Sequence, residues 1–197
     1  MDGWLLPEPP AELLARKAFQ PRPVIFGFNA DEMLMYVGKP TPERWRQALE
    51  KLPNPDQVDN LLGGLPIPQR LDELESATQF TCPSIALANS FAAGGAPTYV
   101  YRFDRIRAYD HGIGAYHGAE IPYVFDTHDA WPPTDTVDRD LTRRMMGYWQ
   151  SFAATGDPNH DDAPVWPRWN DDARVLSLAE ELRADAFDAR LCSLLGL

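Results

Sequence analysis

The sequence predicts an α/β protein whose sheet is incomplete. Short apolar and β-branched runs that suit buried strands alternate with longer segments of helical periodicity, the pattern of a largely parallel sheet covered by helices. Only three strands can be identified in the 197 residues, fewer than such a sheet normally contains. We therefore expect residues 1–197 to form a single partial domain that belongs to a larger sheet.

The first half of the chain is expected to hold one strand and several helices. After a proline-rich opening with a short helical piece near residues 11–17, the apolar run 24–28 is too short for a helix and suits a buried strand. Asn29 and Asp31 follow this strand, and either could cap a helix that starts there. Thr41, followed by proline, predicts the start of the next helix.

Helices and strands continue to alternate in the rest of the chain. The expected elements are helix 68–95, strand 96–104, helix 135–155, strand 175–178 and helix 184–195. Pro83 should kink or restart the first of these helices, because proline cannot donate a backbone hydrogen bond. Gly156 is expected to end the helix before it.

Composition narrows the classes of partner. Hydrophobic residues make up 44% of the chain and charged residues 24%, which is typical of a folded globular protein. The formal net charge is −11 and no stripe of Lys and Arg is present, so a nucleic-acid partner is not expected. The sequence shows no basic-then-apolar export signal and no apolar run of 18 residues, so no membrane partner is expected and no compartment is predicted.

Two residues have the placement of a catalytic acid and base. Glu32 directly follows the first predicted strand, and His117 lies in a glycine-rich loop after the second. In a hydrolytic triad, a carboxylate orients a histidine, which then takes the proton of a serine. The plainer alternatives are a carboxylate favoured by a helix N-terminus for Glu32 and an ordinary loop histidine for His117.

The segments around these residues resemble the type-B carboxylesterase and cholinesterase-like family of α/β-hydrolases. "PVIFGFNADEM" is similar to the strand and turn of the family's catalytic glutamate, and "YVYRFD" with "GAYHGAEIPYVF" to its last major strand and histidine loop. "MMGYWQSFAATGDPN", the following "WPRWN" and the opening "MDGWLLPEPP" are also similar to family segments. The five segments occur in the family's order.

The resemblance implies a role for three residues. Glu32 matches the triad acid, His117 the triad base, and Glu120 a buried acidic position beside the site. Met33 departs from the glycine that is usual after the glutamate and could alter the turn behind it. The implied reaction is the hydrolysis of small carboxylic esters through an acyl-serine, without a cofactor or metal.

The nucleophile of this family has no counterpart in the chain. No Gly-x-Ser-x-Gly motif and no glycine-rich oxyanion loop occurs, and in the family both precede the segments found here. The expected fold is therefore the C-terminal part of an α/β-hydrolase sheet with flanking helices, in which the N-terminal strands and the nucleophile elbow are absent. Such a chain should be inactive alone and could need a partner chain that carries the N-terminal half. Truncation, an internal start and a split gene all remain open.

Two other functional interpretations remain beside the esterase fragment. A non-catalytic cholinesterase-like binding module is the alternative from another class, although it would have no need of the pair Glu32 and His117. A small α/β protein with a coincidental resemblance is the second, and five ordered segments argue against it.

Several other residues are candidates for chemical roles. His111 is a competing base, but no acid follows it closely. A metal site could draw on five residues, although their spacing does not match the usual helical zinc motif: His117, Glu120, Asp126, His128 and Asp129. The aromatic stripe Tyr148, Trp149 and Phe152 could line an acyl pocket, but core packing is the expected role, as it is for Tyr123 and Phe125.

The two cysteines lie in apolar segments 110 positions apart. Cys82 and Cys192 are too distant in sequence for a CxxC motif. Free buried thiols are expected, and a long-range disulfide remains an alternative.

Overall fold

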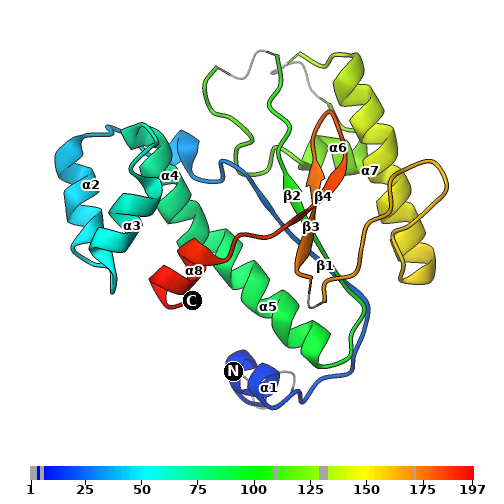
Figure 1. The fold of residues 1–197 in the computed structure, drawn as a ribbon. Helices are drawn as coiled ribbons and strands as arrows, with labels where there is room; N and C mark the ends of the chain where they lie inside the picture. Colours follow the sequence, from blue (N-terminus) through cyan, green and yellow to red (C-terminus); the bar gives the residue numbers. More distant parts are fainter. Residues whose placement is uncertain (1–3, 5–6, 109–110, 129–132, 171) are drawn as a thin grey trace.

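A four-stranded mixed sheet forms the centre of the fold (Figure 1). The computed structural model of the chain describes residue 4 and residues 7–108, 111–128, 133–170 and 172–197. In spatial order, the strands are β1 Val24–Asn29, β2 Thr98–Phe103, β3 Arg174–Leu178 and β4 Arg183–Ala186. The three predicted strands are confirmed, and β4 was not predicted.

Strand direction brings two loops to the same edge of the sheet. β1 and β2 are parallel, with Val24 opposite Thr98 and Asn29 opposite Phe103, and β3 is parallel to β2. β4 is antiparallel to β3 and completes a hairpin. Because β1 and β2 end at the same edge, the turn after β1 and the loop after β2 leave the sheet side by side.

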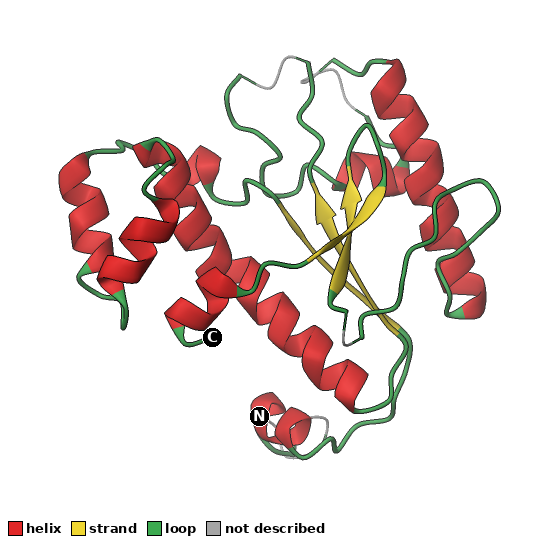
Figure 2. Ribbon diagram, in the orientation of Figure 1, coloured by secondary structure: helices red, strands yellow, loops and turns green. Residues whose placement is uncertain are grey.

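Helices cover both faces of the sheet (Figure 2). Helix α5 (Cys82–Ala93) packs on one face through a cluster that includes Ile85 and Val100. Helices α6 (Ile121–Phe125) and α7 (Thr136–Thr155) cover the other face. The core on that side consists largely of fully buried aromatic and aliphatic side chains, among them Tyr99, Phe103, Met145, Tyr148, Trp166 and Leu176.

A group of helices lies beside the sheet with a core of its own. It consists of α2 (Pro42–Leu49), α3 (Pro55–Leu62), α4 (Ile67–Ser76) and α8 (Arg190–Leu195) (Figure 1). Their apolar faces meet in one cluster around Trp45, Val58 and Leu71. The short helix α1 (Pro10–Ala15) precedes β1 and lies near α5.

The predicted helix boundaries at residues 41, 135 and 156 are confirmed. The Oγ1 of Thr41 accepts a hydrogen bond from the backbone N–H of Arg44 at 3.2 Å and caps α2. The side chain of Asp135 caps α7, and Gly156 ends it with a positive φ. The segment from α4 to α5 restarts as expected: a π-helical stretch, η2 (Ala77–Thr81), precedes Pro83.

The prediction of a helix directly after β1 is wrong. The chain instead makes a tight turn and then a short 3₁₀ helix, η1 (Leu34–Tyr36). The proposed cap Asp31 uses its carboxylate to accept a hydrogen bond from the backbone N–H of Ala115 at 2.8 Å. The backbone N–H of Met33 is directed to Asp72 on α4. These long-range contacts replace the local bonds that a helix would make.

Three further elements differ from the sequence prediction. The expected helix 184–195 divides into β4, whose backbone pairs with β3, and the shorter α8. The apolar segment after His117 forms the short helix α6, and Phe125 at its end is 67% exposed rather than part of the core. Helix α3, which begins with a proline after Asn54, was not predicted.

The two cysteines form a disulfide, so the expectation of free thiols is wrong. The Cα atoms of Cys82 and Cys192 lie 5.5 Å apart, within the range for a disulfide. The bond joins the start of α5 to α8, which the sequence alone does not bring together. The predicted apolar surroundings of both residues are confirmed, since both are buried in a cluster with Leu191 and Leu195.

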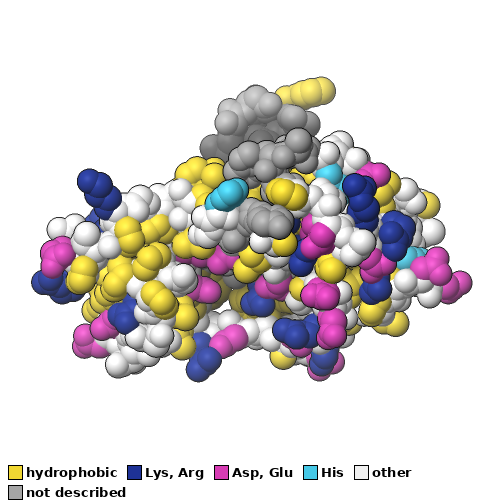
Figure 3. All heavy atoms as spheres, turned by 90° about the horizontal axis from the view of Figure 1, so that it is seen from above, with side chains coloured by type: hydrophobic (Ala, Val, Ile, Leu, Met, Phe, Trp, Pro, Cys, Tyr) yellow, Lys and Arg dark blue, Asp and Glu magenta, His cyan; other side chains and the backbone are white. Residues whose placement is uncertain are grey.

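Basic and acidic side chains are mixed on the surface. On the face that Figure 3 shows, Lys and Arg side chains are scattered among acidic ones rather than gathered into a patch. Among the described residues, none of the helices is both long and apolar enough to cross a membrane.

Candidate active site

The carboxylate of Glu32 is buried in the turn that follows β1. Glu32 is 4% exposed, and its Oε1 accepts a hydrogen bond from the backbone N–H of Asn29 at 2.7 Å. Burial raises the pKa of Glu32 above the ordinary value, and the bonds from Asn29 and His117 oppose this rise. The hydrogen bond from Asn29 also fixes which oxygen remains for another partner.

The imidazole of His117 contacts the second oxygen of this carboxylate. The distance from Nδ1 of His117 to Oε2 of Glu32 is 2.7 Å. Because an ionised carboxylate only accepts hydrogen bonds, Nδ1 is the donor and Nε2 of a neutral ring is left without its proton. The His117 side chain is 51% exposed, and the ring of Phe80 packs on it at a centroid distance of 4.9 Å. The imidazole is therefore oriented on one side and accessible on the other.

Contacts between the two loops hold this pair in place. The backbone N–H of Asp31 donates to the carbonyl of Ala115 at 3.1 Å, and the Asp31 carboxylate accepts from Ala115 N–H. Gly114 lies against this carboxylate with a φ of +66°, and an added Cβ there would come within 2.3 Å of an Asp31 oxygen. A glycine at this position thus permits the close approach of the loops.

Asn29 and Glu120 complete the polar surroundings of the pair. The side-chain Nδ2 of Asn29 donates to the carbonyl of Tyr116 at 2.7 Å and to Oε2 of Glu120 at 2.6 Å. Glu120, expected beside the site, is thus connected to Glu32 through Asn29. It is partly rather than fully buried.

A second carboxylate supports the turn from behind. Asp72 on α4 is 1% exposed, and its Oδ1 accepts from the backbone N–H of Met33 at 2.8 Å and from the hydroxyl of Ser76 at 2.9 Å. Burial raises the pKa of Asp72 to about 7, against the effect of these two hydrogen bonds. Met33, the residue that departs from the family glycine, therefore provides an anchor through its backbone.

Asp72→Asn is expected to stabilise the protein at alkaline pH. A carboxyl whose pKa is 3.8 when unfolded and about 7 when folded contributes most to stability below pH 3.8 and loses this contribution as the pH rises through 7. Asparagine keeps an oxygen for Met33 and carries no charge. In urea unfolding, we expect the variant to gain a few kcal/mol near pH 8, on the order of 1.4 kcal/mol per pKa unit, and almost nothing near pH 4.

Glu75→Gln is the control for this experiment. Glu75 lies on the same helix and forms a partly exposed ion pair with Arg44, which is worth at most about 1 kcal/mol. Parallel stability curves for the wild type and Asp72→Asn between pH 4 and pH 8 would show that Asp72 titrates normally.

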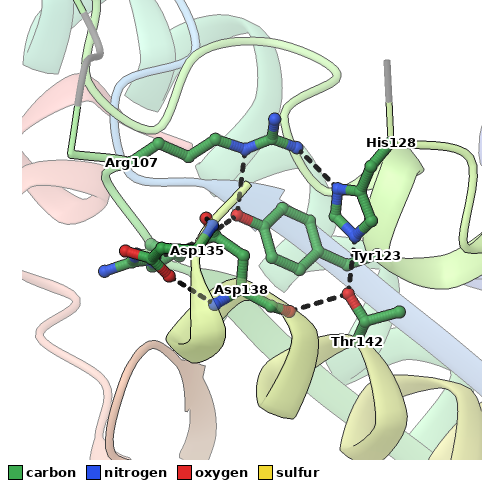
Figure 4. Close-up of polar contacts among 7 residues, drawn as sticks. Arg107, Tyr123, His128, Asp135, Asp138 and Thr142 are labelled. Atoms are coloured by element: carbon green, nitrogen blue, oxygen red, sulfur yellow. Dashed lines mark hydrogen bonds and ion pairs between the residues drawn. The ribbon is translucent and has the colours of Figure 1, made fainter. Parts of the chain in front are cut away.

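A buried network attaches the histidine loop to α7 (Figure 4). Asp138 is fully buried, and its Oδ1 accepts from the Nε of Arg105 and the hydroxyl of Tyr123, each at 2.7 Å. The guanidinium of Arg107 donates to the Tyr123 hydroxyl at 3.1 Å and lies 3.0 Å from Nδ1 of His128. The chain is thus tied to one helix both before and after His117.

The other sequence candidates do not join the site. His111 is exposed and has a positive φ of 56°. Among the described residues, no group of three or more His, Cys, Asp or Glu side chains could hold a metal ion. Of the five candidate metal ligands, Asp129 lies outside the described residues. His128 belongs to the buried network, where its Nε2 lies 2.7 Å from the hydroxyl of Thr142.

The aromatic stripe of α7 divides between core and surface. Tyr148 is fully buried, and its hydroxyl bonds to the carbonyl of Pro164, as expected for a core residue. Trp149 lines an open hollow together with Ile121 and Phe125. The hollow also borders Glu120, so it lies next to the polar surroundings of the site.

Apart from Glu120, the residues that support the pair are not identifiable from the sequence alone. The sequence predicts only a possible helix cap for Asn29, although a polar side chain at the end of a buried strand can signal a role at the edge of the sheet. Asp72 belongs to an amphipathic helix, where an acidic residue is ordinarily exposed, so the sequence gives no sign of its buried role.

Comparisons with known proteins connect this geometry to one family. The family model described as "Carboxylesterase family" matches residues 66–193. Acylcarnitine hydrolase of Rattus norvegicus is 31% identical over 94% of this chain and 38% of its own length. Cocaine esterase of Oryctolagus cuniculus is 30% identical over 90% of this chain and 39% of its own length. A PNB esterase structure superposes with a TM-score of 0.79 at 24% identity, covering 96% of this chain and 41% of that chain.

The fold is part of an α/β-hydrolase fold: a mixed sheet covered by helices on both faces, matching the PNB esterase structure. This confirms the fold class predicted from the sequence. The chain belongs to the carboxylesterase family. It spans about two fifths of the length of the curated relatives that it matches.

Proposed function

We propose that this chain supplies the acid and the base of a Ser-Glu-His triad in a carboxylic ester hydrolase. The observation that carries the proposal is the 2.7 Å contact between Oε2 of Glu32 and Nδ1 of His117. A buried carboxylate on one imidazole nitrogen and an accessible face on the other are what a serine hydrolase requires of its base. Membership of the carboxylesterase family supports small carboxylic esters as the substrate class.

In the proposed reaction, Nε2 of His117 takes the proton from a serine hydroxyl as the oxygen attacks the ester carbonyl. Glu32 stabilises the imidazolium that forms and keeps the ring in the tautomer that can accept this proton. The imidazolium then protonates the leaving alcohol. Water, activated by the same nitrogen, hydrolyses the acyl-serine and restores the enzyme.

The nucleophile comes, in this proposal, from a segment outside the 197 residues. The sequence contains no Gly-x-Ser-x-Gly motif. In the part of the chain that the structure describes, His117 has no serine among its hydrogen-bond partners. We infer that residues 1–197 are a single partial domain. The remaining portion of the sheet, with the serine and the oxyanion donors, would complete it as a further segment or a partner chain.

The isolated chain is expected neither to hydrolyse p-nitrophenyl esters nor to react with a fluorophosphonate probe. Without the serine and the oxyanion donors, the pair has nothing to activate. A fusion of this chain to the remaining portion of the rat acylcarnitine hydrolase is expected to hydrolyse the esters. We call this protein the fusion.

The acylcarnitine hydrolase portion alone is the control, and it should be inactive because it lacks an acid and a base. If the probe labelled the isolated chain, a nucleophile would lie within residues 1–197, and its proposed place outside them would be wrong. An inactive fusion that is folded would contradict the proposal and favour a binding module without catalysis. A second fusion, built from the rabbit cocaine esterase, guards against a mismatch in one chimera.

A further inference from the structure

Asn29 forms hydrogen bonds both with Glu32 and with the loop that carries His117. Its backbone N–H contacts Glu32, and its side chain contacts the carbonyl of Tyr116 and the carboxylate of Glu120. We propose that Asn29 is a positioning residue whose amide locks the histidine loop onto the turn of Glu32 and so keeps His117 in its catalytic tautomer. This inference rests on the proposed function for its consequence in catalysis, but not for its structural part.

The orientation of the Asn29 amide follows from its partners. The carbonyl oxygen of Tyr116 and the carboxylate oxygen of Glu120 can only accept hydrogen bonds, and they lie 2.7 and 2.6 Å from the same nitrogen. A side-chain oxygen in this place would face two acceptors. The site therefore requires the NH₂ group of an amide, with both of its protons in use.

Two of the three hydrogen bonds of Asn29 act on Glu32 and on the residue before His117. Its backbone N–H occupies Oε1 of Glu32, which leaves Oε2 to face His117. Its amide holds the carbonyl of Tyr116, the residue directly before His117. Because Asn29 is 2% exposed and ends a strand of the sheet, the distance between acid and base depends on a rigid element rather than on loop contacts alone.

A separate contact keeps the loops together if the amide is lost. Asp31 bonds to the backbone N–H of Ala115 through its carboxylate and to the Ala115 carbonyl through its own N–H. Neither bond involves Asn29. Replacement of the amide should therefore loosen the position of His117 without separating the loops or unfolding the chain.

Asn29→Asp is the variant that tests this role. It preserves the size of the side chain and the backbone N–H to Glu32, but places a carboxylate oxygen against Tyr116 and Glu120. The ring ¹⁵N signals of His117, recorded on the full 197-residue chain near pH 8, report which nitrogen holds the proton. We expect the Nδ1–H tautomer to be the major form in the wild type and the minor form in the variant.

Asn54→Asp is the matched control. Asn54 also donates an amide bond to a backbone carbonyl, that of Leu194 at 2.8 Å, but among the helices α3 and α8. It should lose stability without a change in the His117 signals. In the fusion, Asn29→Asp should lower kcat about 100-fold and leave KM nearly unchanged, the scale expected when a catalytic group is misplaced by about 1 Å.

The outcomes separate this inference from the proposed function. Unchanged His117 signals in Asn29→Asp, with the variant folded, would overturn the positioning role. An Nε2–H tautomer already in the wild type would overturn the acid–base pair itself. A change of tautomer together with an inactive wild-type fusion would support the positioning role and contradict the esterase proposal. If Asn29→Asp does not fold, Asn29→Ser, which removes the amide without adding a charge, is measured in its place.

Discussion

Glu32→Gln in the fusion is expected to lower kcat for p-nitrophenyl esters by about 10⁴-fold, the effect of the corresponding acid-to-amide change in a serine protease triad. The reason lies in the backbone N–H of Asn29, which donates to one side-chain oxygen of Glu32. The glutamine oxygen will stay with this donor, so its NH₂ group must face Nδ1 of His117. The ring then holds its proton on Nε2 and cannot accept one from serine.

Glu75→Gln in the same fusion is the matched control for this variant. It makes the same chemical change in an ion pair with Arg44 on α4 and should leave kcat within about twofold of the wild type, because this pair does not include Glu32 or His117. A Glu32→Gln fusion that retained a tenth or more of the wild-type kcat would show that the carboxylate does not orient the base.

Asp138→Asn is expected to destabilise the chain by about 3–5 kcal/mol, the cost of removing one charge from a buried ion pair. Oδ1 of Asp138 accepts from Arg105 and Tyr123, and Oδ2 accepts from the backbone N–H of Asp135 at 2.9 Å. An amide NH₂ in either place would oppose a donor, and the guanidinium of Arg105 would keep only the partly exposed carboxylate of Asp135 as counter-ion. Urea unfolding near pH 7 measures the loss.

Asp140→Asn, two residues further along α7, is the control for Asp138→Asn. Asp140 pairs with Arg143 and Arg144 in contact with solvent, so its replacement should cost no more than about 1 kcal/mol. Equal losses for the two variants would mean that the buried network does not carry the stability assigned to it.

The contribution of Asp138 to the free energy of unfolding should also depend on pH. Burial raises the pKa of this carboxyl, but the hydrogen bond from Arg105 and those from Asp135 and Tyr123 outweigh it and hold the pKa below 3.8. A group with a lowered folded pKa contributes its stability above its unfolded pKa and loses it as the pH falls through the folded value. The difference in the free energy of unfolding between the wild type and Asp138→Asn should thus become smaller only in strong acid.

The sequence was sufficient to predict the parts of the fold that follow from local patterns. The apolar run before Asn29, the cap at Thr41 and the glycine at position 156 each express a local preference, and the corresponding strand and helix ends were found where expected. The contact of Glu32 with His117 followed from their places after two strands and from the flanking family segments. These predictions needed only local patterns and the order of the segments along the chain.

The remaining features depend on contacts between distant segments. The turn after β1 does not continue as a helix because Asp31 and Met33 bond to residues 84 and 39 positions away. β4 forms because β3 offers a free edge, and Cys82 meets Cys192 only when α8 reaches α5. No local pattern shows such pairings, and the supporting residues of the site belong to the same class.

The rate of fluorophosphonate labelling of the fusion, compared between the wild type and His117→Gln, tests the central claim most directly. The probe reacts with a serine that a general base activates, and in the proposed function the acylcarnitine hydrolase portion of the fusion supplies that serine. Rapid labelling of the wild type and a loss of at least about 10³-fold in the variant are expected if His117 is the base. Equal labelling of the two folded proteins would show that another group activates the serine, and would contradict the assignment of Glu32 and His117 as its acid and base.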